Sequence, residues 1–252
     1  MPGTDRVSRV AAPAVPVGTD APILEVMATM RAMRRLKPDP VPDEPLEQLV
    51  DAATWAPSGG NIQAYSFVVV TEREQMARLA ELWRVVCDFY LASFATVVPE
   101  HMSERRYEAL RDALRFQRDH FHETPAVIVP CYQLSAWTGR LQRQWRQFAD
   151  SVRGLGARRA ATFAAGLPAF SGRSEAASVY PGVQNLLLAA RALGLGATLT
   201  TWHLALEPEF KAVLGIPRSV KTFAVIPIGW PRGNFGPVVR RPAAEVIHRD
   251  RW

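Results

Sequence analysis

Stretches with a helical spacing of apolar residues alternate along this chain with short, continuously apolar runs. Apolar residues lie three or four positions apart in 23–33, which predicts a helix that ends before Pro38. The same spacing in 43–55 predicts a second helix, and Asp43 is expected to cap its first turn. Short apolar runs bounded by polar and turn residues predict strands. The predicted strands lie at 65–70, 126–132, 197–201 and 222–229.

Residues 179–193 would be apolar on nearly every side of a helix, which is typical of a buried central helix. Pro181 falls in the first turn of this helix and Gly194 follows its last turn, where each residue type is favoured. The preceding stretch, 137–165, mixes arginine and glutamine with aromatic residues. It is predicted to be a helix that ends at 166–168, where glycine and proline stand.

Three shorter signals complete the predicted organisation. Thr71 and Glu74 have the spacing of a capping box and predict the start of another helix. A short helix is predicted at 207–214, with Gly215 as its stop, and the last twenty residues are rich in proline and predict an extended segment. Helices that interrupt strands without a regular strand–helix–strand repeat favour the α+β class, with a sheet flanked by helices.

The composition is that of a folded protein of one large domain or two small ones. The chain has 252 residues, of which 48% are hydrophobic and 21% charged, so a substantial core can form. Residues 1–22 mix proline, alanine, valine and scattered charges, and they predict a flexible arm without the apolar core of a signal peptide. No run of about 18 apolar residues occurs, so neither a transmembrane helix nor a membrane partner is expected.

The two cysteines, Cys87 and Cys131, lie in apolar contexts and form no CxxC pair. They are predicted to be buried free thiols, which are typical of a reducing compartment, so a cytoplasmic location is expected. His120 and His122 are two positions apart and would point away from one another on a helix. Because no third ligand is evident, no metal site is predicted.

The formal net charge of +6 favours anionic ligands, which include nucleic acid, acidic lipid and phosphorylated cofactors. Arg31 and Arg34 would share one face of a continuing helix, and guanidinium groups suit a phosphate. The alternative is a solvated basic helix end. A second arginine pair, Arg240 and Arg241, lies near the C-terminus. Other basic residues are scattered over predicted helices without a recognition motif, so no nucleic-acid partner is predicted.

A polar loop at 57–63 separates a predicted helix from a predicted strand. Its glycines allow the backbone to approach a ligand closely. Ser58, Asn61 and Gln63 supply donors and acceptors that suit the edge of a flat, hydrogen-bonding ring; an ordinary turn is the alternative interpretation. The loop lacks the pattern of a phosphate-binding P-loop. The glycine pair at 194–196 follows a helix and precedes a strand, which is the reverse of a dinucleotide fingerprint.

Taken together, these stretches resemble the nitroreductase-like family of FMN enzymes. The resemblance rests on Met30-Arg-Ala-Met-Arg-Arg-Leu-Lys-Pro-Asp-Pro-Val41, Ala53-Thr-Trp-Ala-Pro-Ser-Gly-Gly-Asn-Ile-Gln63, the helix 183–196, Pro227-Ile-Gly-Trp-Pro231 and Arg240-Arg-Pro242. It covers about 23–98 and 176–252. It implies one α+β domain at 23–252, with a central, mostly antiparallel sheet flanked by helices, in an intertwined homodimer. The segment at about 99–175 would be a variable helical insertion.

The resemblance also implies FMN sites at the dimer interface. The implied cofactor-binding residues are Arg31, Ala32, Met33, Arg34, Pro57, Ser58, Gly59, Asn61, Gln63, Leu199, Thr200, Thr201, Gly229 and Arg240. The first arginine segment and Arg240 would hold the phosphate and part of the ring. The loop 57–63 would line the ring, partly from the partner subunit, and 199–201 would approach flavin N5. Two departures stand out: Ala32 replaces a common serine, and Ala64-Tyr65 replaces a common Pro-Trp or Pro-Arg.

The implied activity is a two-step transfer of electrons. NADPH or NADH would reduce the flavin and leave, and a flat aromatic acceptor such as a nitroaromatic or quinone would then take the electrons. The cofactor performs this chemistry, so no side chain is assigned as a catalytic acid or base. The aromatic stretch 137–170 would suit a lid over the acceptor. Alternatives are a different flavin reaction, a flavin-binding or sequestering protein without NAD(P)H turnover, and a basic nucleic-acid-binding protein.

Overall fold

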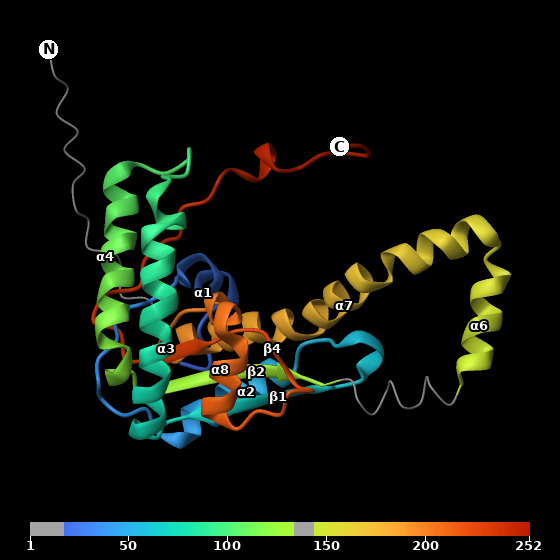
Figure 1. The fold of residues 1–252 in the computed structure, drawn as a ribbon. Helices are drawn as coiled ribbons and strands as arrows, with labels where there is room; N and C mark the ends of the chain where they lie inside the picture. Colours follow the sequence, from blue (N-terminus) through green and yellow to red (C-terminus); the bar gives the residue numbers. More distant parts are fainter. Residues whose placement is uncertain (1–17, 134–143) are drawn as a thin grey trace, which may run out of the picture.

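One antiparallel sheet lies at the centre of the molecule (Figure 1). The computed structural model describes residues 18–133 and 144–252, so most of the predicted arm 1–22 and the start of the predicted helix 137–165 lie outside the described residues. The strand order is β1-β2-β5-β3, and β4 also pairs with β2. The strands are β1 (Tyr65–Val70), β2 (Ala126–Tyr132), β3 (Gly196–Ala197), β4 (Lys221–Thr222) and β5 (Ile226–Gly229).

The first two strands agree with their predicted bounds, whereas the later two predictions are too long. Of the predicted strand 197–201, only Ala197 lies in a strand, which is β3 (Gly196–Ala197). Thr200 forms an isolated bridge with Val225. The predicted strand 222–229 divides into β4 and β5 because its register against β2 shifts by one residue: Thr222 pairs with Cys131, and Ile226 pairs with Ile128. The N–H of Phe223 donates to the carbonyl of Pro130, whereas the N–H of Val225 donates to Thr200.

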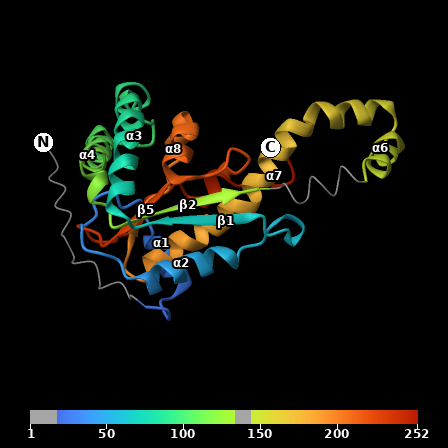
Figure 2. The ribbon, with the colours of Figure 1, turned by 60° about the horizontal axis from the view of Figure 1, so that its bottom comes forward.

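Seven α-helices are described around this sheet. They are α1 (Ile23–Thr29), α2 (Asp43–Thr54), α3 (Arg73–Ala92), α4 (Glu104–His120), α6 (Trp145–Gly154), α7 (Ala157–Ala192) and α8 (Glu207–Leu214). Figure 2 shows α2 and α7 on one face of the sheet and α3, α4 and α8 on the other. The prediction of an α+β fold with a mostly antiparallel sheet flanked by helices is confirmed. The span 99–175 contains the central strand β2 as well as helices.

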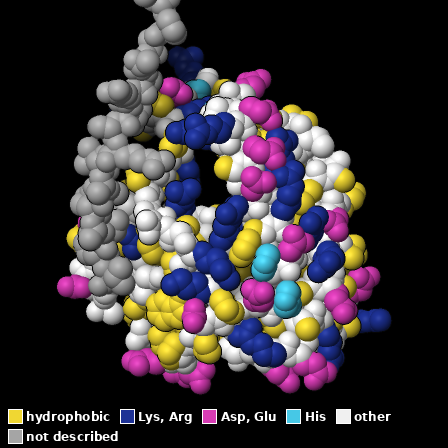
Figure 3. Space-filling model, turned by 90° about the vertical axis from the view of Figure 1, so that its left-hand side faces the viewer, with side chains coloured by type: hydrophobic (Ala, Val, Ile, Leu, Met, Phe, Trp, Pro, Cys, Tyr) yellow, Lys and Arg dark blue, Asp and Glu magenta, His cyan; other side chains and the backbone are white. Residues whose placement is uncertain are grey.

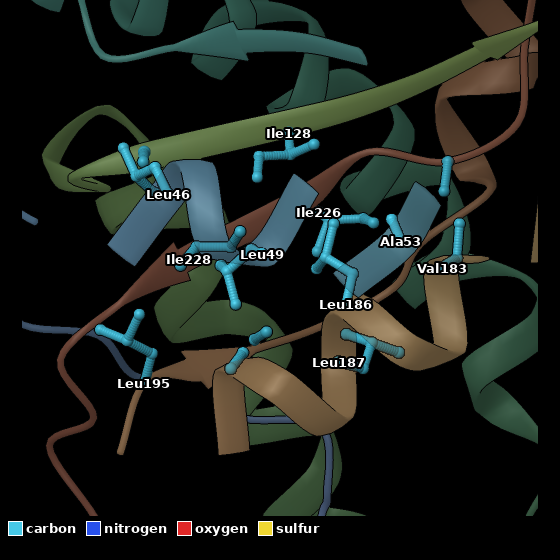
Figure 4. Close-up of a cluster of buried hydrophobic side chains, with 14 of the residues drawn as sticks. Leu46, Leu49, Ala53, Ile128, Val183, Leu186, Leu187, Leu195, Ile226 and Ile228 are labelled. Carbon is cyan, nitrogen blue, oxygen red and sulfur yellow. The ribbon is translucent and has the colours of Figure 1, made fainter. Parts of the chain in front are cut away.

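Two hydrophobic cores lie on opposite faces of β2, because successive side chains of a strand point to opposite sides. Ile128 belongs to the core under α2 and α7, and its neighbours Val127 and Val129 belong to the core under α3 and α8. Figure 4 shows the first core, in which Leu46 and other side chains of α2 lie among residues of α7, β2 and β5 on one face of the sheet.

The longest helix runs through two prolines. The predicted end at 166–168 and the predicted start near 179 are both wrong, because α7 continues from Ala157 to Ala192 with Pro168 and Pro181 inside it. At 36 residues it is about 54 Å long. Its first half and α6 project from the body of the molecule (Figures 1 and 2). Gly194 ends it with a φ of 77°, as predicted.

Three predicted helix starts and stops are corrected. The first helix ends at Thr29 rather than near residue 33, because Met30 adopts an extended conformation with ψ 122°. Asp43 is the first residue of α2 and makes no side-chain capping bond. The predicted capping box is absent, since α3 begins at Arg73 and Glu74 pairs with Arg78 instead. The short helix α8 and its Gly215 stop agree with the prediction.

The close contact of α2 with α7 predicts opposite effects for two glycine substitutions in α7. A Cβ at Gly182 would lie 2.7 Å from the backbone oxygen of Ala53, so the helices would have to move apart. We expect Gly182→Ala to lower the free energy of unfolding by about 1–3 kcal/mol. Gly166 has no atom within 4 Å of a Cβ position. Gly166→Ala is therefore expected to raise the free energy of unfolding by about 0.5–1 kcal/mol. Urea unfolding measures both; equal effects would contradict this packing.

Candidate functional site

The arginine segment 31–34 is extended, and this changes where its side chains point. The N–H of Met33 donates to the carbonyl of Ala197, and the Thr198 hydroxyl donates to the carbonyl of Met33. Side chains three positions apart share a face of a helix but point to opposite sides of an extended chain. The expectation that Arg31 and Arg34 lie on one face is therefore wrong: Arg31 is exposed, whereas Arg34 is partly buried and lines a cavity.

This cavity has a volume of about 190 Å³ and lies between α3, α4 and the segment 198–202. Its lining brings together four residues that the sequence predicted for the site. These are Arg34, Leu199, Thr200 and Thr201. The remaining lining residues are Trp83, Cys87, Tyr90, Leu110, Leu114, Gln117, Thr198 and Trp202. The cavity therefore joins one end of the extended arginine segment to the turn that follows β3.

Arg34 lies in this cavity without a carboxylate partner among the described residues. Burial lowers the pKa of its guanidinium, an effect that Tyr90 and Cys87 partly oppose. Taking a charged group out of water costs free energy unless another group compensates for it. A partly buried cation that faces a cavity and lacks an ion pair is therefore suited to an anionic or oxygen-rich ligand.

Two further donors in the cavity were missed by the sequence analysis. Trp83 Nε1 and Gln117 Nε2 are buried, and neither has a hydrogen-bond partner among the residues that the structure describes. Buried polar atoms are usually hydrogen-bonded, so each of these needs an explanation, and a ligand with acceptor atoms supplies one. The sequence held one signal for Gln117. It occupies an apolar stripe of α4, four residues before Phe121 and three after Leu114.

A buried histidine anchors the segment that forms one wall of the cavity. His203 is fully buried, and its Nε2 lies 3.1 Å from the hydroxyl of Thr222. That hydroxyl donates to Glu207 Oε1 at 2.8 Å, so it accepts a hydrogen bond from a neutral imidazole. Burial lowers the pKa of His203 to about 4. The neutral ring therefore ties the segment after Thr201 to β4 and α8.

The polar loop 57–63 has an unusual backbone. Asn61 and Gln63 both adopt φ 50°, a left-handed conformation that is uncommon outside glycine and clusters at functional sites. Gln63 stabilises the loop internally: its N–H donates to Ser58 Oγ, and its amide donates to Asn61 Oδ1. The N–H of Gly59 donates to Ser178 Oγ of α7. The side chains of Ser58, Asn61 and Gln63 therefore occupy one compact loop.

The loop and the cavity do not meet within one chain. None of the predicted loop residues, from Pro57 to Gln63, lines the cavity. Figures 1 and 2 show the loop before β1 beside α7, at the end of the sheet away from α4. The predicted site residues are thus divided into two sets, one at the cavity and one at the loop.

The other predicted residues lie in different surroundings. Met33 is buried and Ala32 is exposed, as expected for neighbours in an extended chain. Gly229 is a buried residue of β5, and a Cβ there would lie 2.8 Å from Pro125, so packing alone requires glycine. Arg240 is exposed, and its guanidinium donates to the carbonyl of Val239. Figure 3 shows a hollow on one face of the molecule, with Lys and Arg side chains along part of its rim.

Neither a metal cluster nor an activated thiol is found among the described residues. Within 18–133 and 144–252, no three His, Cys, Asp or Glu side chains are placed to hold a metal ion. Cys87 and Cys131 are buried free thiols, as predicted, and burial raises the pKa of each to about 11, which disfavours the nucleophilic thiolate. No described helix has the length and apolar character needed to cross a membrane.

Comparison with known proteins places this geometry in context. A sequence model described as the nitroreductase family matches residues 27–230. NADH dehydrogenase of Thermus thermophilus is 30% identical, over 86% of this chain and 90% of that protein. A nitroreductase of Desulfitobacterium hafniense with bound FMN has a TM-score of 0.58 at 18% identity and covers 90% of this chain and 98% of its own. Oxidised iodotyrosine deiodinase bound to FMN and 3-iodo-L-tyrosine has a TM-score of 0.59 at 20% identity. The match covers 92% of this chain and 100% of that chain.

The burial of His203 predicts a loss of stability in mild acid. Its folded pKa is about 4, below the ordinary value of 6.5, so the unfolded chain takes up a proton that the folded chain excludes. Its contribution is fully present above pH 6.5 and is lost as the pH falls toward 4, by about 3 kcal/mol. Chemical unfolding at several pH values measures this. His203→Gln retains a donor for Thr222 but does not titrate, so it should show a smaller slope; an unchanged slope would contradict the assignment.

Proposed function

The chain belongs to the nitroreductase family, and from this premise we propose that it is an FMN-dependent oxidoreductase. In this proposal it passes electrons from NADPH or NADH to a flat aromatic acceptor such as a nitroaromatic or a quinone. The observation that carries the proposal is the cavity around Arg34. The partly buried Arg34 lines the same cavity as Trp83 and Gln117, and among the described residues its guanidinium has no ion pair and their Nε1 and Nε2 atoms have no hydrogen-bond partner.

The donor set fits the chemistry of FMN. The pyrimidine edge of its ring presents carbonyl oxygens and a ring nitrogen, which accept hydrogen bonds from an arginine, an amide or an indole N–H. Arg34 and Gln117 can both donate into the cavity, and the hydroxyls of Thr200 and Thr201 add further donors beside them. The phosphate of FMN requires exposed cations, and Arg31 and Arg240 supply these on the surface.

Because the arginine segment 31–34 is extended, Arg31 and Arg34 would contact different parts of FMN. Arg34 points into the protein and would hold the ring edge, where its charge would stabilise negative charge on the reduced ring. Arg31 points outward and would bind the phosphate together with Arg240. Bound FMN would supply the transfer of hydride or single electrons. The protein would hold the ring against 199–201 and limit access of water to it.

We include a homodimer in the proposal, because the loop 57–63 needs a cavity that its own chain does not offer. In a dimer, the Asn61 loop of each subunit would complete the cavity of the other. Large apolar side chains exposed on α1, at the end of α2 and on the projecting helices α6 and α7 support such an interface. These residues are Ile23, Leu24, Met27, Trp55, Trp145, Phe148, Leu167 and Phe170.

A nucleic-acid-binding function is less well supported by the same structure. Three of the five arginines of α4 form ion pairs with acidic side chains of the protein itself. Arg111 pairs with Glu104 and Glu108, and Arg115 pairs with Glu108 and Asp112. These internal ion pairs reduce the positive charge that is available to a nucleic-acid backbone.

An anaerobic titration of the purified protein tests the proposed reaction. The protein is expected to carry oxidised FMN, to lose its visible absorption stoichiometrically with NADPH or NADH, and to regain it on addition of a nitroaromatic or quinone. The absorption spectrum measures each step. A protein that retains FMN but is not reduced by either nicotinamide would favour the flavin-sequestering alternative. A protein that cannot be reconstituted with FMN would contradict the proposal.

Substitutions of the adjacent residues Arg34 and Arg35 test whether the cavity binds FMN. Arg34→Met removes the buried guanidinium but keeps most of the side-chain volume, and we expect it to weaken FMN binding about ten- to a hundredfold. Arg35 is exposed and does not line the cavity, so Arg35→Met should change the affinity less than about threefold. Flavin fluorescence on the apoprotein measures the dissociation constants. Similar losses in both variants would argue for a general effect of charge.

Co-expression tests whether two subunits share each site. Arg34→Met and Asn61→Ala are each expected to impair FMN binding in their own homodimers. A heterodimer of the two variants would have one site with both defects and one with neither, so about half of the normal flavin content should return. If the two residues acted within one chain, mixing the variants would restore nothing.

A further inference from the structure

Arg191, in the last turn of α7, is a buried cation; burial lowers its pKa, and the charge of Glu25 in α1 opposes this effect without forming an ion pair. The residue is 1% exposed, and its Nη1 and Nη2 atoms have no hydrogen-bond partner within the described part of the chain. No carboxylate forms an ion pair with it among the described residues. The C-terminal end of a helix favours a positive charge, but this effect is too small to offset full burial. An apolar side chain would fill this position at lower cost, so core stability alone does not account for an arginine.

Arg191 joins two segments that are far apart in the sequence. Its Nε donates to the hydroxyl of Thr29, the last residue of α1, at 3.0 Å. Its guanidinium plane lies over the ring of Phe235, in the C-terminal segment, with 4.1 Å between the Cζ atom and the ring centroid. A planar guanidinium can donate from Nε and stack on an aromatic ring at the same time, which a lysine or an apolar residue cannot do.

The two joined segments carry the exposed arginines of the proposed phosphate site. Thr29 lies two residues before Arg31, and Phe235 lies five residues before Arg240. The segments also touch directly. A Cβ at Gly236, next to Phe235, would lie 3.9 Å from Nη1 of Arg31. The N–H of Val238 donates to the carbonyl of Ala28 at 2.9 Å.

We propose that Arg191 is a positioning residue for the phosphate subsite, which it shapes by fixing the ends of α1 and of the Phe235 segment so that Arg31 and Arg240 converge. This inference rests on the proposed function, since the anion concerned is the phosphate of FMN. Arg191 itself does not touch the ligand. It fixes the backbone segments that carry the exposed side chains of Arg31 and Arg240. This reduces the conformational entropy that these side chains lose on binding the phosphate.

A comparison of FMN with riboflavin separates a defect at the phosphate from a defect at the ring, because riboflavin has the ring of FMN and lacks the phosphate. Arg191→Met removes the Nε donor and the stacked plane but keeps a long apolar side chain. We expect it to weaken FMN binding about tenfold or more, and riboflavin binding less than about twofold. Phe235→Leu removes the stacking ring alone and should shift the same ratio in the same direction. Titrations of the full-length apoprotein with each flavin give the affinities.

Two controls separate positioning from simple loss of stability. Val183 is fully buried in the same helix, on the core side under the sheet. Val183→Ala should destabilise the fold while leaving the ratio of FMN to riboflavin affinity unchanged. In a background of Arg240→Met, Arg191→Met should cause a clearly smaller further loss of FMN affinity, because residues that act through one another are not additive.

The possible results lead to distinct conclusions. A selective loss of FMN affinity in both the Arg191 and the Phe235 variants supports the positioning role. Equal loss of both flavins, or an unchanged ratio, overturns it and leaves Arg191 a structural residue. If Arg191→Met does not fold, Phe235→Leu decides the question on the same ratio. If the wild-type protein binds neither flavin, the proposed function itself fails, and that result is recognised before any variant is made.

Discussion

The burial of β2 on both faces is the constraint on which the rest of the structure depends. All seven of its residues are buried, and it pairs with β1 along one edge and with β4 and β5 along the other. A strand in this position must be covered by helices on both sides, and two separate cores result. Helices α2 and α7 close one core, and α3, α4 and α8 close the other. Every element of the candidate site is attached to one of these two layers.

This two-sided arrangement explains why the candidate site is divided within one chain. The cavity belongs to the layer of α3 and α4, whereas the loop 57–63 is held against α7 through the hydrogen bond between Gly59 and Ser178. Within the described chain the two sets of residues do not meet, and the proposed homodimer would bring them together. The homodimer is therefore part of the proposed function rather than an addition to it.

Local signals in the sequence were sufficient wherever neighbours along the chain decide the conformation. The bounds of β1, β2 and α8 agree with the prediction, and the stops at Gly194 and Gly215 are where expected, because a short apolar run and a glycine after a helix are signals carried by adjacent residues. The prolines of α7 misled the prediction. Proline removes one hydrogen bond, but near Pro181 the helix packs against α2, where Gly182 meets the backbone of Ala53, and around Pro168 the sequence is rich in alanine, which favours a helix.

The sequence by itself determined the fold class, the two central strands and the residue types that suit a phosphate and a flat ring. Only the tertiary structure decided how those residues are used. Arg31 and Arg34 separate because pairing with Ala197 makes their segment extended, and this pairing joins residues more than 160 positions apart. Trp83, Gln117 and Arg191 gained their significance from buried nitrogen atoms that lack partners among the described residues, which no local pattern encodes. Unsatisfied polar groups are a property of three-dimensional packing, because the atoms that bury them come from distant parts of the chain.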